Sequence, residues 1–261
     1  MISLSPADLA IAASLVLFDA ALSVVLRLRL HRQMLWAAAR MVVQLVAVGY
    51  LLRLVFALRH PAATLAVVLV MAAVAAREIA ARPEHRFKRG AGLLLSATGV
   101  AIATVVTVVL ALATAIRPHP WYDARYAIAL TGIILGSVLN SGSLALDSLL
   151  SAVGLQRTAI EARLALGSSF HEAMAPLLRD AVRRGLLPVI NQMSAAGVIT
   201  LPGIMTGQIL AGLDPLEAVK YQILLMFLLA GSSGLSALII AYGAQRRLTD
   251  DRQRLRLDRL G

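Results

Sequence analysis

A few polar side chains lie inside stretches of sequence that are otherwise strongly apolar, and these residues could handle a cargo inside a membrane. The amides are Asn140, Asn191, Gln192 and Gln208, and the charged groups are Asp19 and Arg40. Because a charge at the centre of a bilayer costs about 2.5 kcal/mol or more, each of them must face protein or water. They could line a pathway, or they could form hydrogen bonds between helices, and Asp19 and Arg40 could pair with each other.

The dipeptide Pro202-Gly203 interrupts one of these apolar stretches. Proline cannot donate a backbone hydrogen bond and glycine adds conformational freedom, so the chain should kink or unwind here. Because unwound backbone in a bilayer is tolerated only against protein or a wet cavity, the break could be a gate, or it could be a static kink. Met193 and Met205 could offer soft ligands to a metal, but methionine is more often a filler in such helices, and no metal site is assigned.

The longest polar insertion runs from Thr158 to Pro188, with apolar and charged residues alternating at helical spacing. We expect two short amphipathic helices, the first ended by Gly167 and the second kinked or interrupted by Pro176. This elbow could lie on the membrane surface. Alternatively, Ile160 and Leu164 could insert into a groove on a partner protein.

Seven apolar segments supply the elements that would position these residues. They cover approximately residues 9–26, 35–58, 61–81, 91–116, 126–150, 185–213 and 218–244, and each can cross about 30 Å of hydrocarbon as a helix. Hydrophobic residues make up 59% of the chain and charged residues 15%, and the mean hydropathy is +0.79. We therefore predict an all-α polytopic membrane protein. The pairs Gly132/Gly136 and Gly203/Gly207 predict close approach of helix backbones.

The distribution of basic residues predicts the orientation of these helices. With the N-terminus outside and the C-terminus inside, nineteen of the 25 Lys and Arg residues fall on the cytoplasmic side. The elbow, at about residues 158–184, is then cytoplasmic. We expect one transmembrane domain over residues 1–245 and a short basic cytoplasmic tail over 246–261, which could rest on anionic lipid. The net charge of +11 thus follows membrane topology and does not indicate a nucleic-acid partner.

The chain carries no pattern typical of an enzyme. The two lysines, Lys88 and Lys220, do not follow a glycine, so there is no Gly-Lys-Ser/Thr phosphate-binding loop. No nucleophile is paired with a base, and cysteine is absent. We expect no catalytic residue and no cofactor in this chain, so that any ATP and Mg²⁺ would be bound by a partner subunit.

Two stretches resemble a known family. Glu161-Ala162 followed by Gly167 resembles the Glu-Ala-Ala…Gly coupling loop of bacterial ABC-transporter permeases, with Arg163 in the place of the second alanine. The stretches at 201–212 and 214–222 look like those of the FetB/YbbM-type iron-export permeases, which have plant relatives linked to aluminium tolerance. Ser137 departs from the asparagine expected after the glycine.

The resemblance implies a permease subunit of the bacterial inner membrane that exports iron or a related metal with a separate, FetA-like ABC ATPase. Two permease copies would meet two ATPases. The segment that couples them would comprise Ile160, Glu161, Ala162, Arg163, Leu164 and Gly167. The charges of Glu161 and Arg163, at the edge of that interface, would fix how the permease aligns with the ATPase.

Other functional interpretations of the same residues stay open. The chain could be an ABC permease for another cargo, such as a sugar nucleotide. It could be an ion-coupled secondary transporter that uses Asp19, Arg40 and Asp147 as a charge relay. It could also be a membrane scaffold without a pathway.

Overall fold

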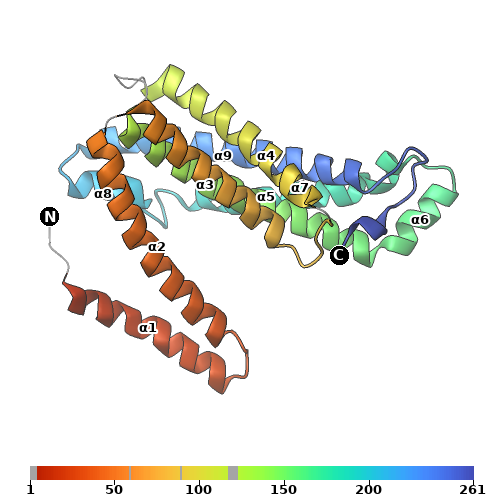
Figure 1. Cartoon of the computed structure of the whole chain (residues 1–261), viewed down its shortest axis with the longest axis horizontal. Helices are drawn as coiled ribbons and strands as arrows, with labels where there is room; N and C mark the ends of the chain where they lie inside the picture. Colours follow the sequence, from red (N-terminus) through yellow and green to blue (C-terminus); the bar gives the residue numbers. More distant parts are fainter. Residues whose placement is uncertain (1–4, 59, 89, 117–122) are drawn as a thin grey trace. The chain divides into compact units, whose positions relative to one another are not determined.

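In the computed structural model of the chain, which describes residues 5–58, 60–88, 90–116 and 123–261, the described residues form helices and no β-strand. The α-helices are α1 (Pro6–Val25), α2 (His31–Leu58), α3 (Pro61–Ala81), α4 (Ala91–Leu110), α5 (Ala124–Leu155), α6 (Arg157–Ala165), α7 (Phe170–Ala195), α8 (Gly203–Leu210) and α9 (Pro215–Arg247). A π-helical turn, η1 (Ala111–Ile116), continues α4, and a 3₁₀ turn, η2 (Leu257–Arg259), lies in the tail. The predicted all-α polytopic class is confirmed (Figure 1).

Six of the described helices, α1 to α5 and α9, are long and apolar enough to cross a membrane. The remaining predicted span, 185–213, which is the sixth in chain order, is not one continuous helix. α7 ends at Ala195, residues 196–202 are not helical, and α8 begins at Gly203 after Pro202 as its N-cap. Gly197 adopts a φ of +82°, which favours glycine, and Pro202 cannot continue the ladder of helical hydrogen bonds. The predicted unwinding at this position is confirmed.

The chain divides into two compact units, Met1–His60 and Pro61–Gly261. The first unit is a hairpin of α1 packed against α2. The turn between them bends through Arg27 and Arg29, which have φ values of 54° and 60°. The Ser23 hydroxyl accepts a hydrogen bond from the amide of Leu30 at 3.0 Å and so closes the turn.

The second unit is built around α5, which packs against α3, α4, α7 and α9. Its 32 residues correspond to about 48 Å of helix, well beyond a hydrocarbon core of about 30 Å. α9, with 33 residues, is similarly long. These two helices are therefore long enough to extend past the membrane, and the hydrophobic core continues into that extension through Leu149, Val153 and Leu248, each fully buried.

Close helix contact in the second unit occurs at glycines outside the two spaced pairs. A Cβ atom at Gly185 of α7 would lie 2.8 Å from the carbonyl oxygen of Ser141 in α5. One at Gly142 would lie 2.6 Å from Cδ1 of Ile240 in α9. The prediction for the two spaced pairs is wrong within this chain, because a Cβ at Gly136, Gly203 or Gly207 would have no neighbour within 4 Å, and one at Gly132 would meet only the end of a methionine.

The elbow differs from its prediction in two respects. α7 runs through both Pro176 and Pro188 without a break, so the expected interruption is wrong. A proline costs a helix about 3 kcal/mol, and here the burial of neighbouring apolar side chains such as Met174 offsets that cost. The apolar face of α7 is also buried in the core of the chain itself, with Phe170 only 4% exposed, so this face is not available to a lipid surface.

The tail after α9 folds back onto the connection between α3 and α4. The amide of Gly261 donates to the carbonyl of Arg86 at 2.8 Å, and the amide of Lys88 donates to the carbonyl of Arg259 at 2.9 Å. Gln253 Oε1 accepts a hydrogen bond from the amide of Phe170 at 2.7 Å. The tail therefore joins the 82–88 connection to the first residue of α7.

Candidate functional site

A polar groove lies between α5 and α7. It consists of two adjoining cavities, of about 210 and 370 Å³, which share Asn140 and Pro188. The smaller is also lined by Ile133, Ser137, Ser141, Val189, Gln192 and Leu229, and the larger by Arg82, Ser143, Leu144 and Asp147. Residues from α5 dominate both walls because Ser137, Asn140, Leu144 and Asp147 recur at the three- or four-residue spacing that places side chains on one helix face.

The depth of the groove follows from the length of α5. At 1.5 Å per residue, Asn140 lies about 24 Å along the axis from Ala124, and Asp147 about 34 Å. In the predicted orientation, the groove therefore extends from within the hydrocarbon to the cytoplasmic interface. Asp147 and Arg82 mark that inner mouth, where Asp147 Oδ1 accepts a hydrogen bond from the amide of Glu84 at 3.3 Å.

Serines hold α9 against the other side of α5. The hydroxyls of Ser137 and Ser233 are 2.6 Å apart, and the hydroxyl of Ser236 donates to the carbonyl of Val138 at 3.0 Å. Ser137, which stands where an asparagine was expected, thus lines the smaller cavity and is bonded to α9. This contact fixes the wall of the groove, because hydroxyl pairs within a membrane have few alternative partners.

The structure brings together only some of the predicted gate and pathway residues. Asn140 and Gln192 line the same cavity. Asn191 and Met193 lie exposed on the last turns of α7, whereas Met205 and Gln208 are half-buried on α8 and do not line these two cavities.

Pro202 and Gly203 lie at the start of α8, next to the unwound segment 196–202. Two apolar side chains of that segment, Val198 and Ile199, are more than 80% exposed. The Oε1 atom of Gln208 on α8 is buried without a hydrogen-bond partner among the described residues. A buried acceptor without a hydrogen-bond partner is costly.

The charged residues predicted inside spans belong to different units. Asp19 on α1 and Arg40 on α2 are both exposed on the hairpin. Asp147 belongs to the second unit, at the inner mouth of the groove.

The predicted coupling residues occupy α6 and the turn that follows it. Ile160 is only 2% exposed and packs in the core, and Leu164 packs against that core. The prediction that these two side chains insert into a partner is therefore wrong for Ile160, which has no surface to offer. Leu155 and Leu166 are each 87% exposed and flank α6 instead. The sequence pattern missed them because Leu155 precedes the amphipathic segment and Leu166 does not share the helical spacing of Ile160 and Leu164.

The remaining coupling residues have structural roles that the sequence did not reveal. Glu161 pairs with Arg157 at 2.8 Å on the exposed side of α6, where Ala162 is also exposed. Arg163 Nη1 donates to the carbonyl of Ala173 at 3.3 Å and so ties α6 to α7. Arg163 therefore acts within the chain, whereas Glu161 remains on the surface.

The turn between α6 and α7 depends on Gly167. Its φ of +90° lies in the region that favours glycine, as its sequence position suggested. Ser169 then starts α7 with a capping box, in which its amide and hydroxyl donate to the carboxylate of Glu172. These two hydrogen bonds lower the pKa of Glu172, so the cap stays ionised at neutral pH.

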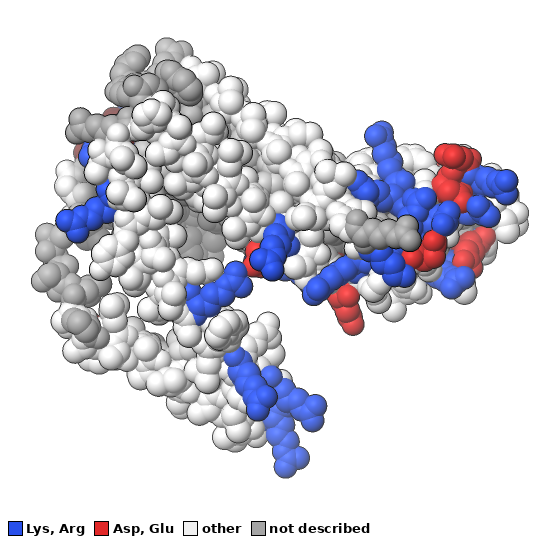
Figure 2. All heavy atoms as spheres, viewed as in Figure 1, with Lys and Arg blue, Asp and Glu red and all other residues white. Residues whose placement is uncertain are grey.

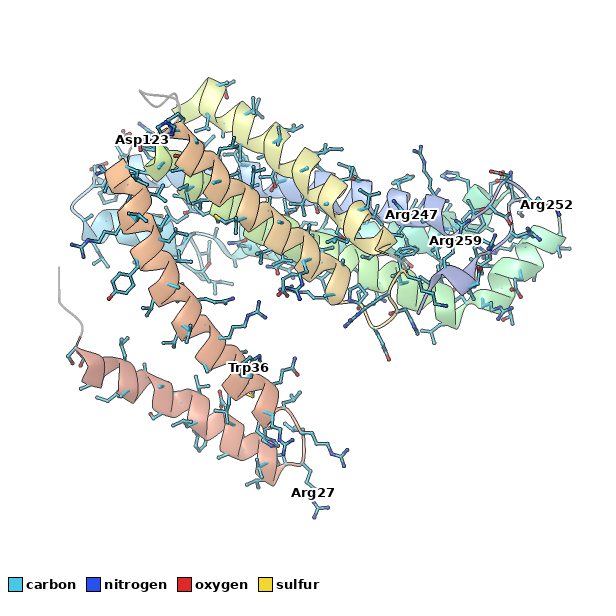
Figure 3. All side chains as sticks on the ribbon, viewed as in Figure 1. Arg27, Trp36, Asp123, Arg247, Arg252 and Arg259 are labelled. Carbon is cyan, nitrogen blue, oxygen red and sulfur yellow. The ribbon has the colours of Figure 1, made fainter. Side chains whose placement is uncertain are left out.

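Basic residues from distant parts of the sequence gather at one end of the second unit. Figure 2 shows Lys and Arg over the end that carries α6 and the tail, while the helical body is nearly free of charge. Figure 3 places Arg247, Arg252 and Arg259 at this end and Asp123 at the other. The gathering agrees with a cytoplasmic elbow. Three basic residues used to predict the orientation lie outside the described residues. They are Arg89, on the predicted cytoplasmic side, and Arg59 and Arg117, on the predicted outer side.

Comparison with known proteins matches residues 6–249 to the model of a family described as "Uncharacterised protein family (UPF0014)". The chain is 41% identical over 228 residues to a UPF0014 membrane protein of Synechocystis sp., covering 87% of each. It is 30% identical over 248 residues to a protein of Escherichia coli named "Probable iron export permease protein FetB", covering 95% of this chain and 93% of that protein. It is 35% identical over 231 residues to the UPF0014 membrane protein STAR2 of Oryza sativa, covering 88% and 79%. No solved structure matches.

Proposed function

Because this chain belongs to the UPF0014 family of membrane proteins, we propose that it is the permease subunit of an ABC-type exporter that carries iron or a related metal. The similarity to the Escherichia coli protein covers 95% of the chain, and therefore both the groove and the elbow. A multi-pass membrane protein of this kind would reside in the bacterial inner membrane.

The observation that carries the proposal is that one helix serves both the groove and the elbow. The first half of α7 packs in the cytoplasmic extension, and its second half contributes Pro188, Val189 and Gln192 to the groove. Gly185 lies between these halves, in close contact with α5. A displacement of α6, transmitted through the Arg163 to Ala173 hydrogen bond, would therefore reach the groove as a movement of α7.

ATP hydrolysis would come from a separate, FetA-like ATPase that binds ATP and Mg²⁺. We place its contact on Leu155 and Leu166, with Glu161 and its neighbour Ala162 between them on the exposed side of α6. Two exposed leucines around a charged pair match the anatomy of a protein interface, with apolar anchors and a polar rim.

A second copy of the permease would complete the groove. Asn140, Asn191 and Gln192 are all exposed in this chain, although Asn140 lies at hydrocarbon depth. Polar groups at that depth must face protein or water. A partner permease across the groove would cover them and create a shared path, which agrees with two permeases meeting two ATPases.

The proposal can be tested by metal transport in inside-out membrane vesicles that contain the permease with or without its co-expressed ATPase. We expect ATP-dependent iron uptake that is strongly reduced in Asn140→Leu and largely retained in Asn140→Gln, which keeps the amide. Transport that persists without the ATPase and follows a proton or sodium gradient would favour the ion-coupled alternative. Equal uptake in both Asn140 variants would rule out the groove as the path.

A further inference from the structure

A further cavity lies where the tail meets the ends of α4 and α9. Its volume is about 610 Å³, and its lining includes Phe87, Lys88, Arg247, Arg256, Asp258 and Arg259. These residues come from three segments that are far apart in the sequence and that the folded tail brings together. Figure 3 shows Arg247 and Arg259 at this place.

The cavity has an excess of positive charge. Arg256 forms salt bridges with Asp258 at 2.8 Å and with Asp250 at 3.5 Å, and Asp250 also pairs with Arg254 at 2.7 Å. These two acids and two arginines balance one another. Within the described part of the chain, Lys88, Arg247 and Arg259 form no salt bridge, so the lining holds three cations beyond these balanced pairs.

Main-chain hydrogen bonds hold two of these cations in place. Arg259 Nη1 donates to the carbonyls of Arg247 and Thr249, at 2.7 and 3.0 Å. Lys88 Nζ donates to the carbonyl of Asp258 at 3.0 Å. Both side chains keep further N–H groups for a ligand, since guanidinium has five donors and ammonium three. A preorganised set of donors with excess positive charge suits a phosphate group.

The depth of the cavity corresponds to the lipid headgroups of the inner leaflet. Ala91, the first residue of α4, lines it. From Ala91 to Ile116 the helix spans about 39 Å at 1.5 Å per residue, compared with about 30 Å of hydrocarbon and 40–45 Å including headgroups. Leu93 and Leu94, in the next turn of α4, are exposed and offer an apolar surface to an acyl chain.

We propose that this cavity binds the phosphate group of an anionic phospholipid of the inner leaflet, with Lys88, Arg247 and Arg259 as its ligands. Basic pockets beside the cytoplasmic ends of membrane helices provide the charge that anionic headgroups require. The bound headgroup would join the tail to α4 and α9. Through Gln253, which accepts from the amide of Phe170, it would also support the start of α7.

The proposal can be tested by native mass spectrometry and thermal unfolding of the full chain in nanodiscs of phosphatidylcholine, with or without phosphatidylglycerol. We expect retained phosphatidylglycerol and a raised Tm for the wild type. Affinity should fall about fivefold for each cation removed in Lys88→Gln and Arg247→Gln, since each basic residue near a membrane surface adds about that much. Arg252→Gln, an exposed change in the same tail, removes the same charge outside the cavity and should bind as the wild type does.

A soluble anion is distinguished in a separate arm, in which phosphatidylcholine nanodiscs receive millimolar inorganic phosphate. A rise in Tm with phosphate that matches the rise with phosphatidylglycerol would overturn the lipid assignment. Equal losses in Arg252→Gln and Arg247→Gln would reduce the effect to net charge and also overturn the proposal. If Arg247→Gln does not fold, Lys88→Gln decides alone, because the Lys88 side chain is exposed and its backbone hydrogen bond remains.

Discussion

Replacing Leu155 and Leu166 by serine should weaken binding of the ATPase without destabilising the permease. Fully burying a leucine side chain is worth about 1.5–3 kcal/mol. Because each of these side chains is 87% exposed in the chain alone, nearly all of that amount is available to a partner. At 1.4 kcal/mol per factor of ten, each substitution should weaken the complex about ten- to 140-fold if its leucine becomes fully buried.

The assay is titration of the purified ATPase onto the permease in nanodiscs, with thermal unfolding measured in parallel. Ile160→Ala provides the contrast, because Ile160 is 2% exposed and its truncation should cost about 2–5 kcal/mol of folding free energy. Leu210→Ser is the matched control, since Leu210 is 76% exposed on α8, at the opposite end of the second unit from α6 (Figure 1). Wild-type affinity in Leu155→Ser and Leu166→Ser, with a normal Tm, would refute the assignment of the docking surface.

Four further outcomes are expected. Gly185→Val should cost about 1–3 kcal/mol of folding free energy, measured by thermal unfolding, because its side chain would meet the carbonyl of Ser141. Pro202→Ala should alter transport in vesicles but not membrane insertion, since it permits a helical hydrogen bond next to the break; unchanged transport would leave the break purely structural. Ser169→Cys should react with an impermeant thiol reagent from the cytosolic side alone, and labelling from outside would reverse the orientation. Hydrogen bonding by Arg256 lowers the pKa of Asp258 from 3.8 to about 2, so the local fold of the tail should persist above about pH 4 and weaken from there towards pH 2, as measured by fluorescence of a tail label.

Local signals in the sequence were sufficient to predict the fold class and the breaks at Gly167 and at Pro202-Gly203. Long apolar segments predicted six helices that the structure contains. Gly167 predicted where α6 ends and the Pro202-Gly203 pair predicted where α8 begins, because positive φ and a missing donor act within one turn. Pro176 carried the same local signal, but the interruption it suggested does not occur. There, burial of the adjacent face of α7 in the core outweighs the lost hydrogen bond.

Contacts between distant segments could not be predicted in the same way. Ile160 has the pattern of an exposed anchor, but the core at this end of the second unit buries it. That core exists because α5 and α9 continue past the membrane, and hydropathy alone does not indicate how far a helix continues. The groove depends similarly on the register between α5 and α7. Asn140 and Gln192 line the same cavity because α5 and α7 are in contact at Gly185, and neither local sequence indicates this contact.

The same long helices explain why the elbow and the groove would act as one mechanical unit. A helix on the membrane surface could shift without moving the membrane-spanning core, but α7 is continuous from its capping box at Ser169 to Gln192 in the groove wall. Packed cores resist gradual deformation, so force on α6 would move α7 as a rigid element. The unwound segment 196–202 then lies where that rigid element ends, and it is the first place at which backbone torsions could absorb the movement. A rigid α7 that ends at an unwound segment fits a permease driven by an ATPase on its cytoplasmic side.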